Sequence, residues 1–235
     1  MLPYIERFDN LSKGALMLPS DFEDMFREEE LSSELVPYIM EGSFGPYINH
    51  PLVQSIPHSP VMNRRANQML VHKKEALETA IAEGKWHSVV FLHERPFRLN
   101  AFLEHVPELP PEQYWPLVSS VWTDSENIWQ NVDVWMDLWS ADHHRHDLVM
   151  DEDEMEAFNA LPDLITVYRG SQSGLPIGLS WTTDRERAEW FANRYGQDNA
   201  MVFEGKINKD HVLAYFLGRN ESEIVAFPHD VVLIE

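Results

Sequence analysis

The sequence predicts an α+β protein, with a mostly helical region over residues 1–160 and a strand-rich region over residues 161–235. Before residue 160, several segments place apolar residues three and four positions apart, as an amphipathic helix requires. After it, short apolar runs end at glycine or polar residues, as buried strands do. The order strand, strand, helix and then several strands favours α+β organisation over alternating βαβ units.

The composition excludes several classes of function. The 235 residues carry a net charge of −21, which repels phosphate backbones, so we expect a basic protein surface as partner rather than nucleic acid. The absence of cysteine excludes disulfides, thiol catalysis and cysteine-bound metals. No run of 18 apolar residues and no basic segment followed by an apolar run occurs, so we expect a cytoplasmic protein without a membrane partner. The sequence does not indicate an oligomeric state.

The helical region begins with two predicted helices and an intervening loop. Residues 20–30 start with Ser20 as an N-cap and continue with acidic residues suited to a first turn. Residues 42–60 are rich in Gly, Pro and Ser and predict an extended loop. Residues 63–84 predict a helix that Gly84 terminates. Its apolar face consists of Ala66, Met69, Leu70, Leu77 and Ile81. Residues 85–92 fit either a short helix or a buried strand.

Tryptophan-rich segments predict two more helices, over residues 110–122 and 124–140. Trp115, Trp122 and Trp129 recur every seven residues, and Trp135 and Trp139 are four apart. Such a stripe is typical of core packing between helices, and the alternative is a stacking platform for a base or a sugar. The acidic residues from 151 onward predict the first turn of another helix.

The strand-rich region begins with two predicted strands, over residues 163–170 and 178–184. A helix follows, with Thr183 as N-cap, Glu186 completing a capping box, and Gly196 at its end. Its predicted apolar face, which we assign to the core, consists of Ala188, Phe191, Ala192 and Tyr195. Further strands are predicted at residues 200–207, 211–217, 222–228 and 231–235.

Polar motifs lie at three of these strand ends. They are Arg169-Gly170, Ser180-Trp181-Thr182 and Glu221-Ser222-Glu223. If Glu221 and Glu223 share a strand, they point to one face about 7 Å apart. Their like charges then repel one another unless a site uses both. The alternative is that Glu221 belongs to the preceding loop and both carboxylates are solvated.

The order and context of these motifs resemble the R-S-E class of mono-ADP-ribosyltransferases over residues 164–235. These enzymes cleave NAD⁺ and transfer ADP-ribose to a protein side chain. The resemblance implies a split β-sheet catalytic core over residues 161–235, with NAD⁺ as substrate and no metal. It implies that Glu223 binds the ribose 2′-hydroxyl and stabilises the positive charge of an oxocarbenium-like transition state. Glu221 would lie near the acceptor, which Glu-x-Glu motifs indicate to be arginine.

The resemblance also implies roles for the remaining motif residues. Arg169 would bind a phosphate or ribose oxygen, and the backbone at Gly170 would bind the nicotinamide amide. Ser180 would bind the ribose and help to hold Glu223. Thr182 would brace the strand end beside the NAD⁺ site. The alternatives are a structural ion pair for the arginine, an ordinary turn for the glycine, and a local backbone contact for the serine.

The sequence departs from the family pattern in two places. Only ten residues separate Arg169 from Ser180, where relatives carry a longer, partly helical insertion. We therefore expect the helical region to supply part of the NAD⁺-binding wall or to select the target. Trp181 occupies a position where a small polar residue is usual, and we expect it to face the core. Tyr195 has a second interpretation as an aromatic neighbour of nicotinamide.

Other functions remain open at this point. An NAD⁺ glycohydrolase would use water as the acceptor. A metal-dependent hydrolase could use Asp142, His143, His144, His146 and Asp147, although these residues scatter over several faces of a helix. An acidic inhibitor that mimics nucleic acid would need no catalytic residues. Relatives of the transferase arrangement are bacterial or phage proteins that act as toxins or host-takeover factors, so we expect action inside a bacterial cytoplasm.

Overall fold

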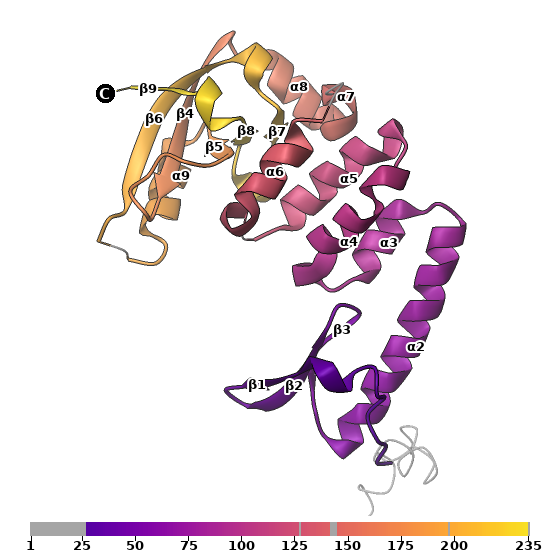
Figure 1. Cartoon of the computed structure of the whole chain (residues 1–235). Helices are drawn as coiled ribbons and strands as arrows, with labels where there is room; N and C mark the ends of the chain where they lie inside the picture. Colours follow the sequence, from indigo (N-terminus) through magenta and orange to yellow (C-terminus); the bar gives the residue numbers. More distant parts are fainter. Residues whose placement is uncertain (1–26, 127, 142–144, 197, 235) are drawn as a thin grey trace, which may run out of the picture. The chain divides into compact units, whose positions relative to one another are not determined.

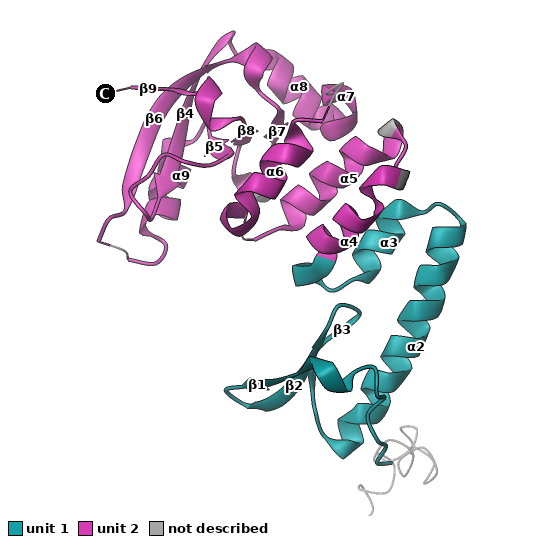
Figure 2. Cartoon of the chain, viewed as in Figure 1, with its two compact units in different colours: residues 1–97 teal, residues 98–235 magenta. Residues whose placement is uncertain are grey.

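The computed structural model describes residues 27–126, 128–141, 145–196 and 198–234, and it confirms the α+β class. The chain forms two compact units, Met1–Phe97 and Arg98–Glu235 (Figure 2). The units divide at a different point from the predicted regions, because the later helices pack with the C-terminal strands. One such tie is the His146 side chain, whose Nε2 lies 2.7 Å from the carbonyl oxygen of Val212. The predicted helix start at Ser20 lies outside the described residues.

Unit 1 contains an antiparallel sheet that the sequence analysis missed. Its strands are β1 (Ile39–Gly42), β2 (Gly45–His50) and β3 (Val53–Pro57), in that order (Figure 1). The predicted loop over residues 42–60 is therefore wrong. Gly45, with φ of +105°, lies at the turn between β1 and β2, so this glycine marks a hairpin rather than a long loop. Ile48, Val53 and Ile56 are buried and give the sheet its apolar face.

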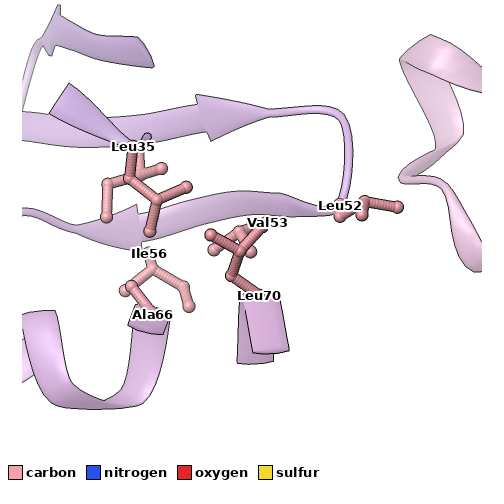
Figure 3. Packing of buried hydrophobic residues seen from close by; sticks show 7 residues of the cluster. Leu35, Leu52, Val53, Ile56, Ala66 and Leu70 are labelled. Atoms are coloured by element: carbon pink, nitrogen blue, oxygen red, sulfur yellow. The ribbon is translucent and has the colours of Figure 1, made fainter. Parts of the chain in front are cut away.

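Helix α2 (Pro60–Ala82) confirms the predicted first long helix of unit 1. Ser59 caps it by accepting a hydrogen bond from the Met62 amide at 3.3 Å. Ala66 and Leu70 belong to one buried cluster with Val53 and Ile56 of β3 and with Leu35 and Leu52, which lie outside the strands (Figure 3). Gly84, with φ of +64°, follows the helix end as predicted. The ambiguous segment that comes next is helix α3 (Trp86–Leu92).

The first half of unit 2 is helical. Its described helices are α4 (Arg98–His105), α5 (Pro111–Asp124), α6 (Val132–Trp139), α7 (His146–Val149) and α8 (Glu152–Ala160). Trp115, Trp122, Trp135 and Trp139 are buried, which confirms core packing for these four. Trp129 is 61% exposed, so the prediction of a continuous core stripe is wrong there. The reason is that α5 ends at Asp124 and Trp129 lies in a separate 3₁₀ turn, η4 (Ile128–Asn131).

The described strands of the second half form a six-stranded antiparallel sheet in the order β7-β8-β5-β4-β6-β9 (Figure 1). The strands are β4 (Leu164–Ser171), β5 (Ser180–Thr182), β6 (Met201–Asn208), β7 (Ala214–Phe216), β8 (Glu223–Val225) and β9 (Val232–Leu233). Every predicted strand of this region is therefore present. Within the described residues, β4 and β5 pair only at Tyr168 and Thr182. The sheet thus consists of two halves that meet at one residue pair and then diverge.

Helix α9 (Arg185–Asn193) packs against β4, β5 and β6. Gly170 allows this close approach, because a Cβ there would lie 2.0 Å from the Ala188 carbonyl oxygen and 2.6 Å from the Ala192 nitrogen. Gly196 has φ of +60° just beyond the helix, as predicted. Tyr195 is 62% exposed, so its assignment to the core is wrong. It lies two residues past Asn193, the last helical residue, and so outside the apolar face of the helix.

The predicted N-cap of α9 is wrong by one residue. The Asp184 carboxylate, not Thr183, accepts hydrogen bonds from the amides of Glu186 and Arg187, at 2.9 and 3.3 Å. The Thr183 amide instead donates to the Ser222 carbonyl. This hydrogen bond continues the pairing of β5 with the segment before β8, so the helix begins after Asp184. Within the described residues, no helix is both long and apolar enough to cross a membrane.

Replacing the cap tests this assignment. We expect Asp184→Ala to lower the free energy of unfolding by about 1 kcal/mol, because two helix amides lose their acceptor. Thr183→Ala should change it by less than about 0.5 kcal/mol. Urea unfolding of both variants measures the difference, and a larger loss for Thr183→Ala would restore the cap predicted from the sequence.

Candidate functional site

A cavity of about 430 Å³ opens in unit 2 where β4 and β5 diverge. All six residues that the sequence analysis assigned to the site line it: Arg169, Gly170, Ser180, Thr182, Glu221 and Glu223. They come from β4, from β5, from the start of β8 and from the loop that leads into it. The divergence of the two half-sheets therefore creates the space into which three strand ends converge.

Arg169 lies in the gap between the half-sheets. Its Nη1 donates a hydrogen bond to the Ser180 carbonyl at 2.5 Å, where a continuous ladder would have backbone pairing. Gly178 leaves room for the guanidinium, because a Cβ at this position would lie 2.3 Å from Nη2. Burial lowers the pKa of Arg169 to about 10 against the opposing effect of the nearby Glu223 charge. The side chain therefore remains a cation at neutral pH.

The Arg169 side chain also has an unsatisfied donor. Its Nε is buried and has no hydrogen-bond partner among the described residues. A buried donor without an acceptor costs about 1–3 kcal/mol, so ligand oxygens or water at this position would stabilise the site.

Glu223 is a buried carboxylate, with 7% of its surface exposed. It is the first residue of β8, and its backbone is in register with Thr182 on β5 and Phe216 on β7. A buried carboxylate is costly unless a cation or hydrogen-bond donors compensate it. The charge of Glu223 acts on Arg169, so the two form an electrostatic pair that lines one cavity.

The alternative interpretation of Glu221, as a solvated residue of the preceding loop, is correct for its backbone and wrong for its side chain. Its backbone belongs to the loop, at the end of a 3₁₀ turn, η6 (Gly218–Asn220), and β8 begins two residues later. Its side chain, however, is not solvated: it is 13% exposed and accepts a hydrogen bond from Arg187 Nη2 at 2.8 Å. Both carboxylates therefore line the cavity although only Glu223 lies in a strand.

All three residues of the second motif line the cavity, and Trp181 is at the same time buried in the core. Trp181 is buried, as expected, and its Nε1 donates to the Gly178 carbonyl at 3.2 Å. The Thr182 hydroxyl donates to the Glu221 carbonyl at 2.6 Å and accepts from the Asp184 amide at 3.0 Å, so it braces the strand end as expected. Ser180 is half-buried at the mouth of the gap, and its carbonyl binds Arg169.

Other residues also line the cavity, among them Trp129 and Tyr195, for which a stacking platform and an aromatic neighbour of nicotinamide were the alternative interpretations. Trp129 and Tyr195 contribute largely exposed aromatic rings. Phe191, which is half-buried, also lines the cavity. Arg194 adds a second cation, with its guanidinium 5.1 Å from the centre of the Tyr195 ring. Two features of the sequence indicate that these rings lie outside the core. The helix ends before Trp129, and Tyr195 directly precedes the helix-ending Gly196. Part of the wall comes from the helical region, through Glu126, Ile128, Trp129, Gln130 and Val132.

Metal ligation is not supported by the described residues, in which no group of three or more His, Asp or Glu side chains is placed to hold a metal ion. Asp142, His143 and His144 of the alternative metal cluster lie outside the described residues. The Asp147 carboxylate accepts two hydrogen bonds from Arg145, at 2.8 and 2.6 Å. The metal hypothesis therefore stays a prediction.

Comparisons of the chain with models of known protein families, with curated proteins and with solved structures find no match.

Proposed function

We propose that this chain is a mono-ADP-ribosyltransferase, with an ADP-ribosyltransferase-like split sheet over residues 161–235, that transfers ADP-ribose from NAD⁺ to a protein arginine. One observation carries the proposal: Arg169, Ser180 and Glu223, which the motif resemblance assigns to the NAD⁺ ribose, line one cavity from three strand ends. The cavity volume falls in the range of about 300–1,000 Å³ that is usual for small-molecule sites.

The chemistry accounts for the buried carboxylate. The bond between the nicotinamide nitrogen and ribose C1′ breaks, its electron pair leaves with neutral nicotinamide, and positive charge develops on the ribose. The Glu223 carboxylate, hydrogen-bonded to the 2′-hydroxyl, would stabilise that charge more in the transition state than in the substrate. An acceptor guanidine nitrogen then bonds to C1′ and releases a proton to solvent or to Glu221. No metal is needed in this scheme.

The remaining lining residues suit the rest of NAD⁺. Arg169 and Arg194 supply positive charge for the diphosphate and ribose oxygens. Trp129, Phe191 and Tyr195 offer aromatic faces for the nicotinamide and adenine rings. Gly170 lines the cavity as well as packing against α9, so its backbone lies beside the ligand space.

The acceptor is proposed from charge and motif. The net charge of −21 favours a basic protein target, and a carboxylate such as Glu221 can bind an incoming guanidinium. We place the reaction in the cytoplasm of a bacterial cell, as the resemblance to bacterial and phage transferases implies. An NAD⁺ glycohydrolase shares the first step and differs only in using water, whereas a nucleic-acid mimic would leave NAD⁺ intact.

The proposal is tested by incubating the protein with labelled NAD⁺ in bacterial lysate. We expect nicotinamide release, measured by chromatography, and ADP-ribose on arginine side chains, identified by mass spectrometry. Release without labelled protein would indicate the glycohydrolase. Intact NAD⁺ in the presence of lysate would contradict the proposal.

Trp129→Ala tests the cavity wall. We expect the KM for NAD⁺ to rise about tenfold, because a stacked base loses about 1–3 kcal/mol. The free energy of unfolding should change by less than about 0.5 kcal/mol, since the ring is largely exposed. Phe44→Ala is the control, because Phe44 is fully exposed in unit 1. Equal KM values for Trp129→Ala and wild type would remove Trp129 from the site.

A further inference from the structure

Glu221 is held by an arginine of its own chain. Arg187 on α9 donates from Nη2 to Glu221 Oε1 at 2.8 Å, and the two side chains are 25% and 13% exposed. A hydrogen-bonded ion pair that is largely shielded from water is stronger and better ordered than an exposed one. The orientation of the Glu221 carboxylate is therefore fixed from α9.

The backbone around Glu221 is fixed as well. Asn220 and Ser222, on either side, have φ of +53° and +44°, in the left-handed region that non-glycine residues seldom adopt. Two hydrogen bonds hold this segment: the Thr182 hydroxyl donates to the Glu221 carbonyl, and the Thr183 amide donates to the Ser222 carbonyl. Such conformations persist where surrounding contacts determine them, and they cluster at functional sites.

The Arg187 side chain also contacts aromatic rings of its own helix. Its guanidinium lies 4.6 Å from the centre of the Trp190 ring and 5.0 Å from that of Phe191. Its amide donates to the Asp184 cap at the start of α9. Glu221 belongs to the described residues that line the cavity and Arg187 does not, so Arg187 contacts the carboxylate from α9 without itself lining the cavity.

Glu221 and Glu223, two of the carboxylates that line the cavity, thus each have their own guanidinium. Glu223 interacts with Arg169, and Glu221 pairs with Arg187. The two cations offset the repulsion between two negative side chains in one small cavity. The two ion pairs also occupy different places. Arg169 and Glu223 lie at the gap between the half-sheets, whereas Arg187 and Glu221 join α9 to the loop before β8.

We propose that Arg187 is a positioning residue that aims Glu221 at the acceptor and so sets how often ADP-ribose reaches an arginine rather than water. This inference rests on the proposed function. A carboxylate in fixed orientation holds the acceptor guanidine near C1′, and a displacement of about 1 Å can cost up to a hundredfold in rate. When Glu221 turns away, water competes more successfully for the same oxocarbenium-like centre.

The test compares two products of one reaction, with agmatine as a small guanidine acceptor: released nicotinamide and ADP-ribosyl-agmatine. We expect Arg187→Met to lower the ratio of transfer to release about tenfold, and Arg187→Lys to restore part of it. Glu221→Gln should lower the ratio similarly, and the double variant should add little, since Arg187 acts through Glu221. Arg185→Met is the matched control, because Arg185 lies on the same helix in exposed ion pairs with Glu189 and Glu204.

The possible failures are distinguishable. An unchanged ratio in Arg187→Met, an equal loss of release and transfer, or a rise in transfer would overturn the positioning role; the last would make Arg187 a competitor for the acceptor site. Wild-type release without any agmatine product would overturn it too. Absence of wild-type nicotinamide release would instead defeat the proposed function. If Arg187→Met melts below the assay temperature, Arg187→Gln replaces it under the same criteria.

Discussion

Glu223→Gln is expected to slow nicotinamide release from NAD⁺ by a factor of about 10²–10³, the usual effect of removing one preorganised charge-stabilising group. Glutamine has nearly the shape of glutamate and keeps an oxygen for the 2′-hydroxyl, but it lacks the negative charge that opposes the positive charge on the ribose. The measurement is kcat for nicotinamide release by chromatography, with circular dichroism to verify the fold.

Glu221→Gln is the matched control for this prediction, because both carboxylates line the same cavity. We expect it to slow release far less than Glu223→Gln does, since we assign Glu221 to the acceptor. If Glu223→Gln releases nicotinamide at the wild-type rate, Glu223 is not the catalytic carboxylate.

Gly170→Ala is expected to lower the free energy of unfolding by about 3 kcal/mol. Its Cβ would lie 2.0 Å from the Ala188 carbonyl oxygen and 2.6 Å from the Ala192 nitrogen, and backbone atoms of a helix cannot give way individually. Helix α9 would have to move away from β4 and would take Arg187 with it. Urea unfolding at fixed pH measures the loss.

Gly218→Ala provides the comparison, because no atom lies within 4 Å of the Cβ that it would add. We expect this variant to change the free energy of unfolding by less than about 0.5 kcal/mol. Equal effects of the two substitutions would show that α9 and β4 do not pack as closely as described.

The strands of the second half were predictable because each is a short apolar run with a clear polar or glycine boundary. The sheet of unit 1 was not predictable in the same way. Its alternation is interrupted by an irregularity in the register between Ile48 and Asn49, and the Gly and Pro residues around it suggested a loop. Trp129 was mispredicted for a related reason. It lies seven residues after Trp122, but α5 ends between the two, so the spacing does not place them on one helix face.

The motif residues of the candidate site could be predicted from the sequence, but the rest of the cavity wall could not. The motifs identified the six residues that now line one cavity, because strand ends carry polar groups that the sheet itself does not need. The part of the wall that the helical region supplies and the pairing of Arg187 with Glu221 depend on tertiary contacts between distant segments. Such contacts leave no periodic signal in the sequence.

The most direct test of the account is a crystal structure of Glu223→Gln with NAD⁺, since the slowed variant should retain intact dinucleotide. We predict the nicotinamide ribose between Arg169, Ser180 and residue 223, with the nicotinamide ring beside Gly170. NAD⁺ bound elsewhere, or a cavity without NAD⁺ at saturating concentration, would contradict the claim that these three strand ends form the NAD⁺ site.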